Sequence, residues 1–388
     1  MNTANVIIEC LRHAVIGKEI DEALFDSFTE ADFVDLFKQA KRHDVANVVA
    51  ATLSEIKLPE TFKNVAKAFE KEQMTAVFRC ENIVYEIERI SDLFSRVGID
   101  HILLKGAVIR DLYPEPWMRT SCDIDVLIRE ESINDAIKAL TEKLDYSYDG
   151  RRGYHDVPLY SSGGVHLELH FSIMENVSIL DRVLSRVWDY AGLVEGCRYE
   201  LSPEFFMYHV IAHTAYHFIR GGCGIRSILD LCLIKNNLEF DKERFISLCR
   251  ESEIEEFYYA ATALADCWFS DGKHSEITEG IERFILDGGT YGDTETGIAA
   301  LQESRGGKLG YAKSRIWISY HHLQQRYPSL KSRVFIPVYQ VRRWIEVVLR
   351  GKLKRSAREL KLNKDLDSKK VSSVMKIMHS VGLDNHLQ

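Results

Sequence analysis

The run 123–128, with the sequence DIDVLI, restricts the fold of this chain more than any other segment. Alternate side chains of a strand share a face, so Asp123 and Asp125 point one way and the β-branched residues at even positions point the other. Two carboxylates a few ångströms apart repel by roughly 4 kcal/mol at an effective dielectric of about 20. A divalent cation between the carboxylate oxygens removes that penalty. The run therefore predicts a strand that presents a metal site for phosphoryl or nucleotidyl transfer.

A second pair of strands supplies a third carboxylate. Residues 154–160 and 165–171 alternate in polarity and are joined by Ser-Ser-Gly-Gly, a hairpin signal. In the second strand Glu168 shares a face with His166 and His170, opposite the apolar face. Glu168 could join the two aspartates around one or two magnesium ions, or it could be a solvated residue on an exposed face.

The segments on either side of this α/β stretch show helical spacing. Up to about residue 95 apolar residues recur every three or four positions, and from Pro203 onward the helical pattern returns. A chain of 388 residues also exceeds what one hydrophobic core usually organises. We expect an α+β protein with a helical region over 1–95, a mixed-sheet core over 96–195 and a helical region over 196–388.

Composition narrows the class of partners. The formal net charge of −8 argues against a protein that binds long nucleic acids, because phosphate backbones select basic surfaces. The eight cysteines are scattered without a CxxC pair, which favours a reducing compartment. We find neither a signal-peptide pattern nor an uncharged apolar stretch long enough to span a bilayer. We therefore expect a soluble, cytoplasmic protein.

In order along the chain, these motifs resemble the polymerase-beta-like nucleotidyltransferases, and in particular the bacterial uncharacterised nucleotidyltransferases, in which a Leu-Lys-Gly turn replaces the usual Gly-Ser. The matching residues are Leu104-Lys105-Gly106, Arg119, Asp123-Ile124-Asp125-Val126-Leu127 and Leu167-Glu168-Leu169-His170. The resemblance covers most of the chain and implies a small mixed-sheet nucleotidyltransferase core between helical regions. It also implies metal-dependent transfer of an NMP from an NTP to a hydroxyl or phosphate, with release of pyrophosphate.

The resemblance assigns roles residue by residue. Asp123, Asp125 and Glu168 would be the catalytic and metal-binding residues, with Mg²⁺ or Mn²⁺ as the ion. Lys105, Gly106 and Arg119 would bind the nucleotide, with ATP as the default donor. Lys105 could instead extend to solvent, and Arg119 could pair with Asp123 or Glu168 rather than with a phosphate. Ala107 stands where relatives have a serine that helps to hold the triphosphate, which puts that contact in doubt.

A histidine-rich helix is predicted around residues 204–220. Its histidines follow one another at i, i+4 spacing: His209, His213 and His217. One tetrahedral metal cannot easily reach all three, so an interhelical seam or a cleft wall is the favoured interpretation. Arg226 and Asp230 have the spacing of a helix-bracing pair. The resemblance keeps His170, His213 and Asp230 as candidates for the cleft wall.

The C-terminal stretch 331–370 is strongly basic, with thirteen Lys or Arg against four Asp or Glu. A basic amphipathic helix can lie on an anionic membrane, bind a polyanion or form the solvated face of a terminal helix. We expect the residues after about 366 to fray. The expected partners are an NTP and an acceptor that the sequence does not identify, such as a small molecule, a sugar or a protein. The alternative is a catalytically lapsed scaffold on a membrane surface, in an envelope-polysaccharide pathway.

Overall fold

Six strands form one mixed sheet in the order β3-β4-β2-β1-β6-β5. The computed structural model describes residues 3–289, 292–327, 329–349, 351 and 353–387. The strands are β1 (His101–Leu103), β2 (Asp123–Ile128), β3 (Asp156–Tyr160), β4 (His166–His170), β5 (Ala191–Glu195) and β6 (Arg198–Leu201). Strand β2 pairs parallel to β4 and antiparallel to β1, and β3 and β4 form the predicted hairpin. The predicted α+β fold, with a small mixed sheet flanked by helices, is confirmed.

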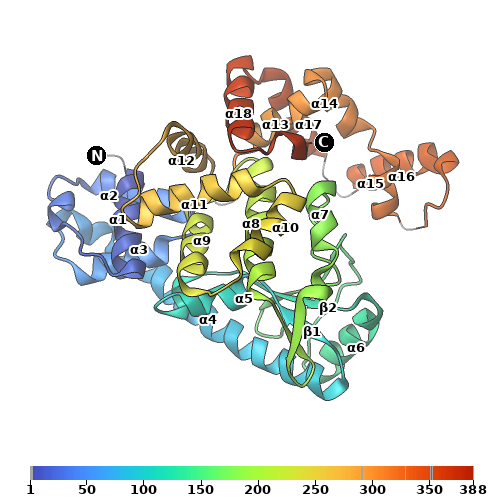
Figure 1. The fold of residues 1–388 in the computed structure, drawn as a ribbon, viewed down its shortest axis with the longest axis horizontal. Helices are drawn as coiled ribbons and strands as arrows, with labels where there is room; N and C mark the ends of the chain where they lie inside the picture. Colours follow the sequence, from blue (N-terminus) through green and yellow to red (C-terminus); the bar gives the residue numbers. More distant parts are fainter. Residues whose placement is uncertain (1–2, 290–291, 328, 350, 352, 388) are drawn as a thin grey trace.

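One face of the sheet is covered by two helices, α4 (Lys63–Val97) and α6 (Ile133–Lys143). The even-numbered residues Ile124, Val126 and Ile128 are all buried against them. Figure 1 shows α4 running the full width of the sheet beneath it, with α6 beside its C-terminal end. Because these aliphatic residues fix the orientation of β2, the two aspartates of the strand must face the opposite side.

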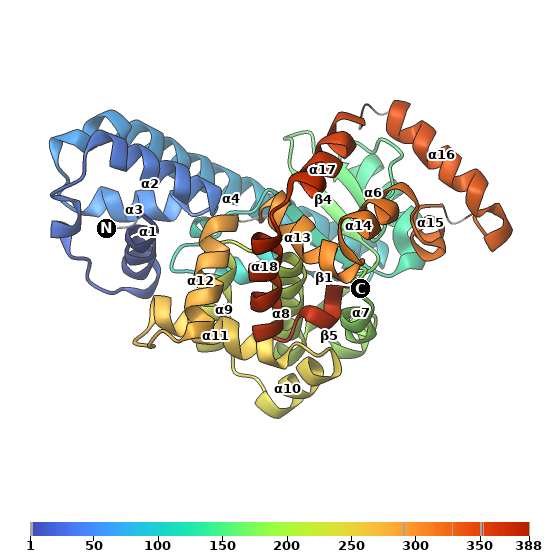
Figure 2. The same cartoon turned by 90° about the horizontal axis from the view of Figure 1, so that it is seen from above.

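The N-terminal helices α1 (Thr3–Leu11), α2 (Glu30–Arg42) and α3 (Ala46–Glu55) pack together at one end of the molecule. Thr29 caps the N-terminus of helix α2, where its hydroxyl accepts from the backbone N–H of Asp32 in a capping box. Figure 2 shows this group extending from the body along the first half of α4. Asp44, in the turn between α2 and α3, reaches the candidate site described below.

Further helices lie on the other side of the sheet. They are α5 (Gly106–Ile109), α7 (Ser178–Leu184), α8 (Pro203–Ile219), α9 (Ile225–Asn237), α10 (Lys242–Glu251), α11 (Glu255–Phe269) and α12 (Glu276–Gly288). Among them α10 packs on α8, α11 on α9 and α12 on α11. The turn between α8 and α9 requires glycine, because Gly221 has a φ of 130° and an added Cβ would lie 2.6 Å from the Asp293 carbonyl oxygen. This tight turn brings the histidine-rich α8 and the start of α9 to the same side of the sheet.

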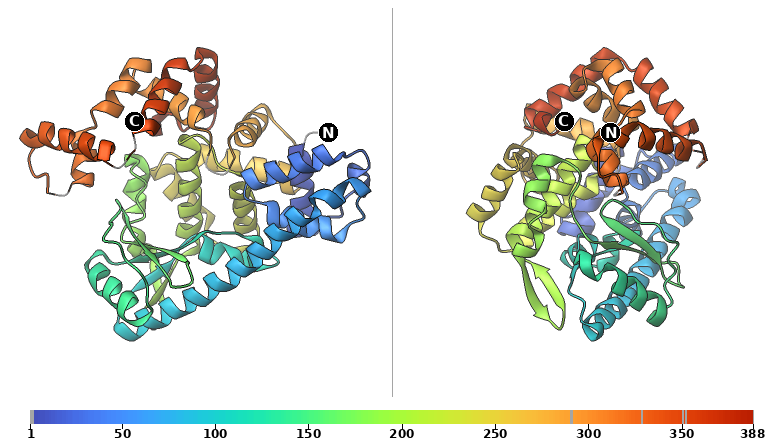
Figure 3. Two further views of the ribbon diagram at one scale, coloured as in Figure 1. Left: turned by 180° about the vertical axis from the view of Figure 1, so that it is seen from behind. Right: turned by 90° about the vertical axis from the view of Figure 1, so that its right-hand side faces the viewer.

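The C-terminal helices form a further layer above α8, as the reverse view in Figure 3 shows. They are α13 (Thr294–Ser304), α14 (Gly307–Ile316), α15 (Tyr320–Arg326), α16 (Ile336–Leu349), α17 (Leu353–Asp365) and α18 (Ser368–Ser380). The prediction that the chain frays after about residue 366 is wrong. Val371, Val374 and Met378 of α18 are buried in the main core, because the helix is amphipathic and packs on α13.

The main hydrophobic core draws residues from the N-terminal helices, from the sheet and from the C-terminal helices. Because this core is shared by all three predicted regions, it does not mark boundaries between them, and the division of the chain at residues 95 and 195 remains a prediction. None of the described helices combines the length and the apolar character that crossing a bilayer requires.

Candidate functional site

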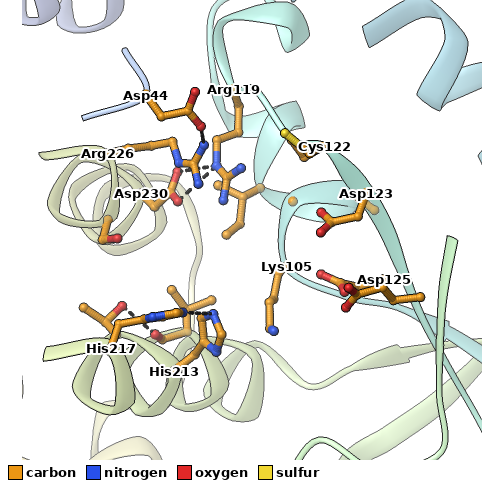
Figure 4. A pocket seen from close by; sticks show the side chains of 18 residues that line it. Asp44, Lys105, Arg119, Cys122, Asp123, Asp125, His213, His217, Arg226 and Asp230 are labelled. Carbon is orange, nitrogen blue, oxygen red and sulfur yellow. Dashed lines mark hydrogen bonds and ion pairs between the residues drawn. The ribbon is translucent and has the colours of Figure 1, made fainter. Parts of the chain in front are cut away.

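A cavity of about 360 Å³ lies between the aspartate face of β2 and helices α8 and α9. Figure 4 shows acidic side chains on one wall, an arginine–aspartate group on another and the α8 histidines below. The charged and histidine side chains that line it are Asp44, Lys105, Arg119, Asp123, Asp125, Glu168, His213, His217, Arg226 and Asp230. Except for His170, every residue that the sequence proposed for the site lines this one cavity.

The carboxylates meet because of the strand register. Strands β2 and β4 pair so that Asp125 lies directly opposite Glu168, on the face away from α4. Two groups of possible metal ligands result, Asp123 with His166 and Glu168, and Asp125 with Glu168 and His170. Within each group the ligand atoms lie within 4.8 Å of one another. Oxygen donors at this spacing are what a divalent cation requires.

His170 is the most closely engaged of the histidines. Its Nε2–H donates to Asp125 Oδ1 over 2.8 Å and lies 3.5 Å from Glu168 Oε2. It is 4 % exposed and lines a second cavity rather than the first. Burial works against its charged form, but hydrogen bonds to Asp125 and Glu168 raise the pKa of His170 to about 9. An imidazolium here supplies the positive charge that the carboxylates need in metal-free protein.

The two aspartates of β2 differ in acidity. Burial, reinforced by the neighbouring Asp125 and Glu168 carboxylates, raises the pKa of Asp123. Burial also opposes ionisation of Asp125, but the Lys105 cation and the hydrogen bond from His170 together hold the pKa of Asp125 well below its usual range. Asp123 is therefore the aspartate of β2 whose negative charge is less well compensated, because burial and the two carboxylates outweigh Lys105 and His166.

On folding, His170 gains hydrogen bonds to the Asp125 and Glu168 carboxylates, which stabilise its protonated form. This contribution to stability is complete below the unfolded pKa of about 6.5 and is lost as the pH rises through about 9. In chelator-treated protein we expect the free energy of unfolding to fall by about 2–3 kcal/mol between about pH 6 and about pH 10. His170→Gln keeps an N–H donor without the charge, so its curve should be flatter. Denaturant unfolding at a series of pH values measures both curves, and equal slopes would contradict the assignment.

Lys105 stands in a strained conformation at the junction of β1 and α5. Its φ is 41° and its ψ is −109°, a region that residues with a side chain rarely adopt. In Figure 4 its side chain lies between the acidic strand and His213. Such strain is retained where the surroundings enforce it, and here it aims a cation into the cavity.

This strain can be measured by comparing two substitutions that remove the same charge. We expect Lys105→Gly to be about 1 kcal/mol more stable than Lys105→Ala, because only glycine accepts the positive φ without cost. Urea denaturation of the two variants gives the difference directly. A Lys105→Ala variant as stable as Lys105→Gly would show that the backbone is relaxed.

Arg119 pairs with neither Asp123 nor Glu168, contrary to one of the alternatives above. Its Nε–H donates to both Asp230 oxygens, at 2.9 and 3.0 Å, in a pair that is almost fully buried. The Tyr113 hydroxyl donates to the same carboxylate over 2.7 Å. Asp230 therefore holds the side chain of Arg119 along the cavity wall.

The prediction that Arg226 braces α9 through Asp230 is wrong. Arg226 instead forms an ion pair with Asp44 and donates to the Thr120 carbonyl oxygen over 3.1 Å. Arg226 and Asp230 therefore each pair with a residue outside α9, because the turn before α9 directs the start of that helix towards the loop before β2. Sequence reasoning missed Asp44, which lies in a helix–helix turn far from the motifs.

The loop around Gly106 is closely packed. A Cβ at Gly106 would meet Arg119 Nη1 and Ser121 Cβ, both at 3.4 Å. Ala107 lines the cavity at the position where relatives carry serine, and Ser121 lines it from the loop before β2. The Ser121 hydroxyl accepts from Arg110 over 2.9 Å. Ser121 thus brings a hydroxyl to the cavity that also holds Ala107, and the polar loop before the Asp-Ile-Asp run was the signal for it.

The histidines of α8 do not form a shared metal site with one another among the described residues. His213 Nδ1–H donates to Glu175 Oε1 over 2.5 Å, and His213 Nε2 lies 3.0 Å from His217 Nε2. His209 is fully buried. The interpretation as a cleft wall fits His213 and His217, whereas Glu175, in the segment after β4, had no signal in the sequence.

Comparison with known proteins adds one finding. A family model described as "Uncharacterised nucleotidyltransferase" matches residues 29–270, a span that holds the sheet, the acidic cluster and helices α8 and α9. No curated protein and no solved structure matches the chain. Because the family model covers well over half of its length, the chain belongs to this nucleotidyltransferase family.

Proposed function

We propose that this protein is a metal-dependent nucleotidyltransferase that moves an NMP from an NTP, by default ATP, to a hydroxyl or phosphate acceptor and releases pyrophosphate. One observation carries the proposal: three carboxylates from two paired strands converge on a cavity that also contains Lys105. Like charges gather at such a place only where positive charge compensates them.

The residues present fit a divalent cation. Asp123, Asp125 and Glu168 offer oxygen ligands within 4.8 Å of the partner atoms in their groups, which suits Mg²⁺ or Mn²⁺. When bound, such an ion supplies charge neutralisation at the phosphate oxygens and a lowered pKa for the attacking hydroxyl.

The protein's own side chains divide the remaining tasks. Lys105, the backbone at Gly106 and the neighbouring guanidinium of Arg119, which Asp230 holds, contact the triphosphate. The acceptor oxygen forms the new bond to the α-phosphorus while the α–β bridging bond breaks and pyrophosphate leaves. We assign Glu168 as the group that takes the acceptor's proton, because it alone of the three carboxylates also lines the second cavity, beside His170.

Calorimetric binding of ATP and the other NTPs, with Mg²⁺ or Mn²⁺, tests the proposal. We expect metal-dependent binding by the native protein and none by an Asp123→Ala/Asp125→Ala variant. Asp111→Ala is the matched control, because Asp111 is exposed and does not line the cavity. Failure of every NTP to bind at about millimolar concentration, about the weakest affinity of a functional site, would favour the lapsed scaffold instead.

A further inference from the structure

A second cavity, of about 200 Å³, lies beside the first and shares a wall with it. The shared residues are Lys105, Glu168, His213 and His217. The larger cavity has the size of ordinary ligand sites, which begin at about 300 Å³, whereas the smaller one has room for only a small molecule. A molecule there would lie directly across Glu168 and Lys105 from a nucleotide in the larger cavity.

The smaller cavity is lined by buried polar groups without partners. Both ring nitrogens of His209 are buried and have no hydrogen-bond partner among the described residues, and the same is true of Nδ1 of His155 and Nδ1 of His170. His209 is 1 % exposed. Unsatisfied buried polar atoms cost about 1–3 kcal/mol each, so four of them around one cavity point to a polar occupant.

The lining also indicates the chemistry of that occupant. Two acids, Glu168 and Glu175, stand against two cations in this lining, Lys105 and the protonated His170, so the cavity has no excess positive charge with which to hold an anion. Burial lowers the pKa of His209 far below its usual range and that of His217 to about 3, so both rings are neutral. A neutral imidazole offers one donor and one acceptor, the same pair that a hydroxyl group offers in return.

We propose that this cavity, which we call the acceptor cavity, binds the acceptor as a neutral, hydroxyl-rich small molecule of monosaccharide size. The inference rests on the proposed function and specifies its second substrate. One hydroxyl of the bound molecule faces Glu168 and attacks the α-phosphorus, losing its proton to that carboxylate while pyrophosphate leaves. The remaining hydroxyls lie against the His155, His170 and His209 side chains that line the cavity.

The full-length protein with ATP and Mg²⁺ is tested against a panel of neutral monosaccharides and polyols and against the phosphate esters of the same compounds. We expect pyrophosphate release to rise at least about tenfold with one or more neutral compounds, which gain one AMP unit by mass spectrometry, but not with the esters. His209→Phe keeps an aromatic ring and removes both nitrogens. It should raise the acceptor KM at least about tenfold and leave ATP binding within about twofold.

His101→Phe is the matched control, because His101 is equally buried but lies in β1 and does not line the cavity. Thermal unfolding of both variants excludes misfolding as the cause. The inference is overturned if ATP binds and only anionic or no compounds are modified, or if His209→Phe leaves the acceptor KM unchanged. Absence of ATP binding by the native protein would overturn the proposed function itself, so the two failures are distinguishable.

A separate observation concerns α16 and the segments beside it. Large apolar side chains are exposed along this stretch at a density found nowhere else among the described residues: Val334, Phe335, Val338, Val341, Trp344, Ile345, Val348, Leu349 and Leu353. We call them the 334–353 surface. Helix α16 packs on α15, and Figures 1 and 2 show the pair projecting from the body. Contiguous apolar patches on soluble proteins usually mark an interaction site.

Basic residues accompany this surface. Exposed cations next to the apolar side chains include Lys331, Arg333, Arg342 and Lys354, whereas Arg350 and Lys352 lie outside the described residues. Glu346 is the acidic residue of α16, and it is paired with Arg326 and Arg342. A projecting helix with apolar side chains between cations matches the geometry and charge of an anionic lipid surface.

We infer that the 334–353 surface docks the protein onto anionic membranes. Vesicle flotation with phosphatidylcholine alone and with added phosphatidylglycerol tests this directly. Binding should require the anionic lipid, weaken with salt and fall at least about tenfold in Val338→Asp/Ile345→Asp. Met74→Asp/Phe78→Asp is the matched control, because these exposed apolar residues lie on α4. No flotation with anionic vesicles, or a dimer that the first variant dissociates, would overturn the inference.

Discussion

Replacing Asp123 with asparagine should lower nucleotidyl transfer at least about 100-fold and at the same time stabilise the metal-free protein by about 1 kcal/mol. The two effects have one cause. The Asp123 carboxylate is desolvated and lies beside Asp125 and Glu168, which raise its pKa and therefore penalise its ionised form. Asparagine preserves the shape and removes that penalty, but it also removes a ligand charge that the reaction requires.

The measurements are pyrophosphate release with saturating ATP and Mg²⁺, and urea denaturation in a chelator at about pH 8. At that pH an aspartate in the unfolded chain, with its ordinary pKa of about 4, is ionised. Asp111→Asn serves as the control, because this exposed carboxylate lies outside the cavity and should change neither quantity. A loss of stability in Asp123→Asn would mean that Asp123 makes a favourable contact in the metal-free state. Unchanged transfer would remove Asp123 from the site.

The central strand and its site could be predicted because their signals are local. A period of two residues fixes which side chains share a face, and the aliphatic residues of β2 have only one face of the sheet on which to be buried. The same period of two residues places Glu168 on the polar face of β4, and the parallel pairing of β4 with β2 then brings Glu168 to the aspartates. The family model matches residues 29–270, and this span includes both β2 and β4.

Other parts of the site depend on contacts between distant segments. Asp44 reaches the cavity from a turn between N-terminal helices, and Glu175 meets His213 across 38 residues of sequence. No local pattern encodes such pairs. The positive φ of Lys105 is equally hidden, because a lysine gives no sign of the backbone that tertiary packing imposes on it.

The prediction for the C-terminal end failed for a different reason. The residues after Leu366 are polar on average, and average polarity predicted fraying. Helix α18 is nevertheless amphipathic, and its few apolar residues are spaced to share one buried face. Periodicity was the better guide than composition, because burial depends on the face and not on the mean.

Replacing Arg119 with methionine should destabilise the protein by about 3–5 kcal/mol, because it leaves the Asp230 carboxylate charged, buried and without its cation. Only the Tyr113 hydroxyl would still donate to it. Arg96→Met is the matched control, since Arg96 pairs with Asp92 on the exposed surface and its loss should cost less than about 1 kcal/mol. Urea denaturation measures the loss of unfolding free energy in each variant. Equal losses would show that the charge left on Asp230 does not destabilise the protein.

A second substitution separates the charge from the packing. In Arg119→Met/Asp230→Asn the amide oxygen still accepts from Tyr113, but no uncompensated charge remains, so at least about half of the lost stability should return. NTP binding should not return with it, because the guanidinium that faces the cavity is still absent. Recovery of stability without recovery of binding would mean that Asp230 acts through Arg119, as the group that positions it. Recovery of both would mean that Arg119 only neutralises Asp230 and that Lys105 and the backbone at Gly106 hold the phosphates without it.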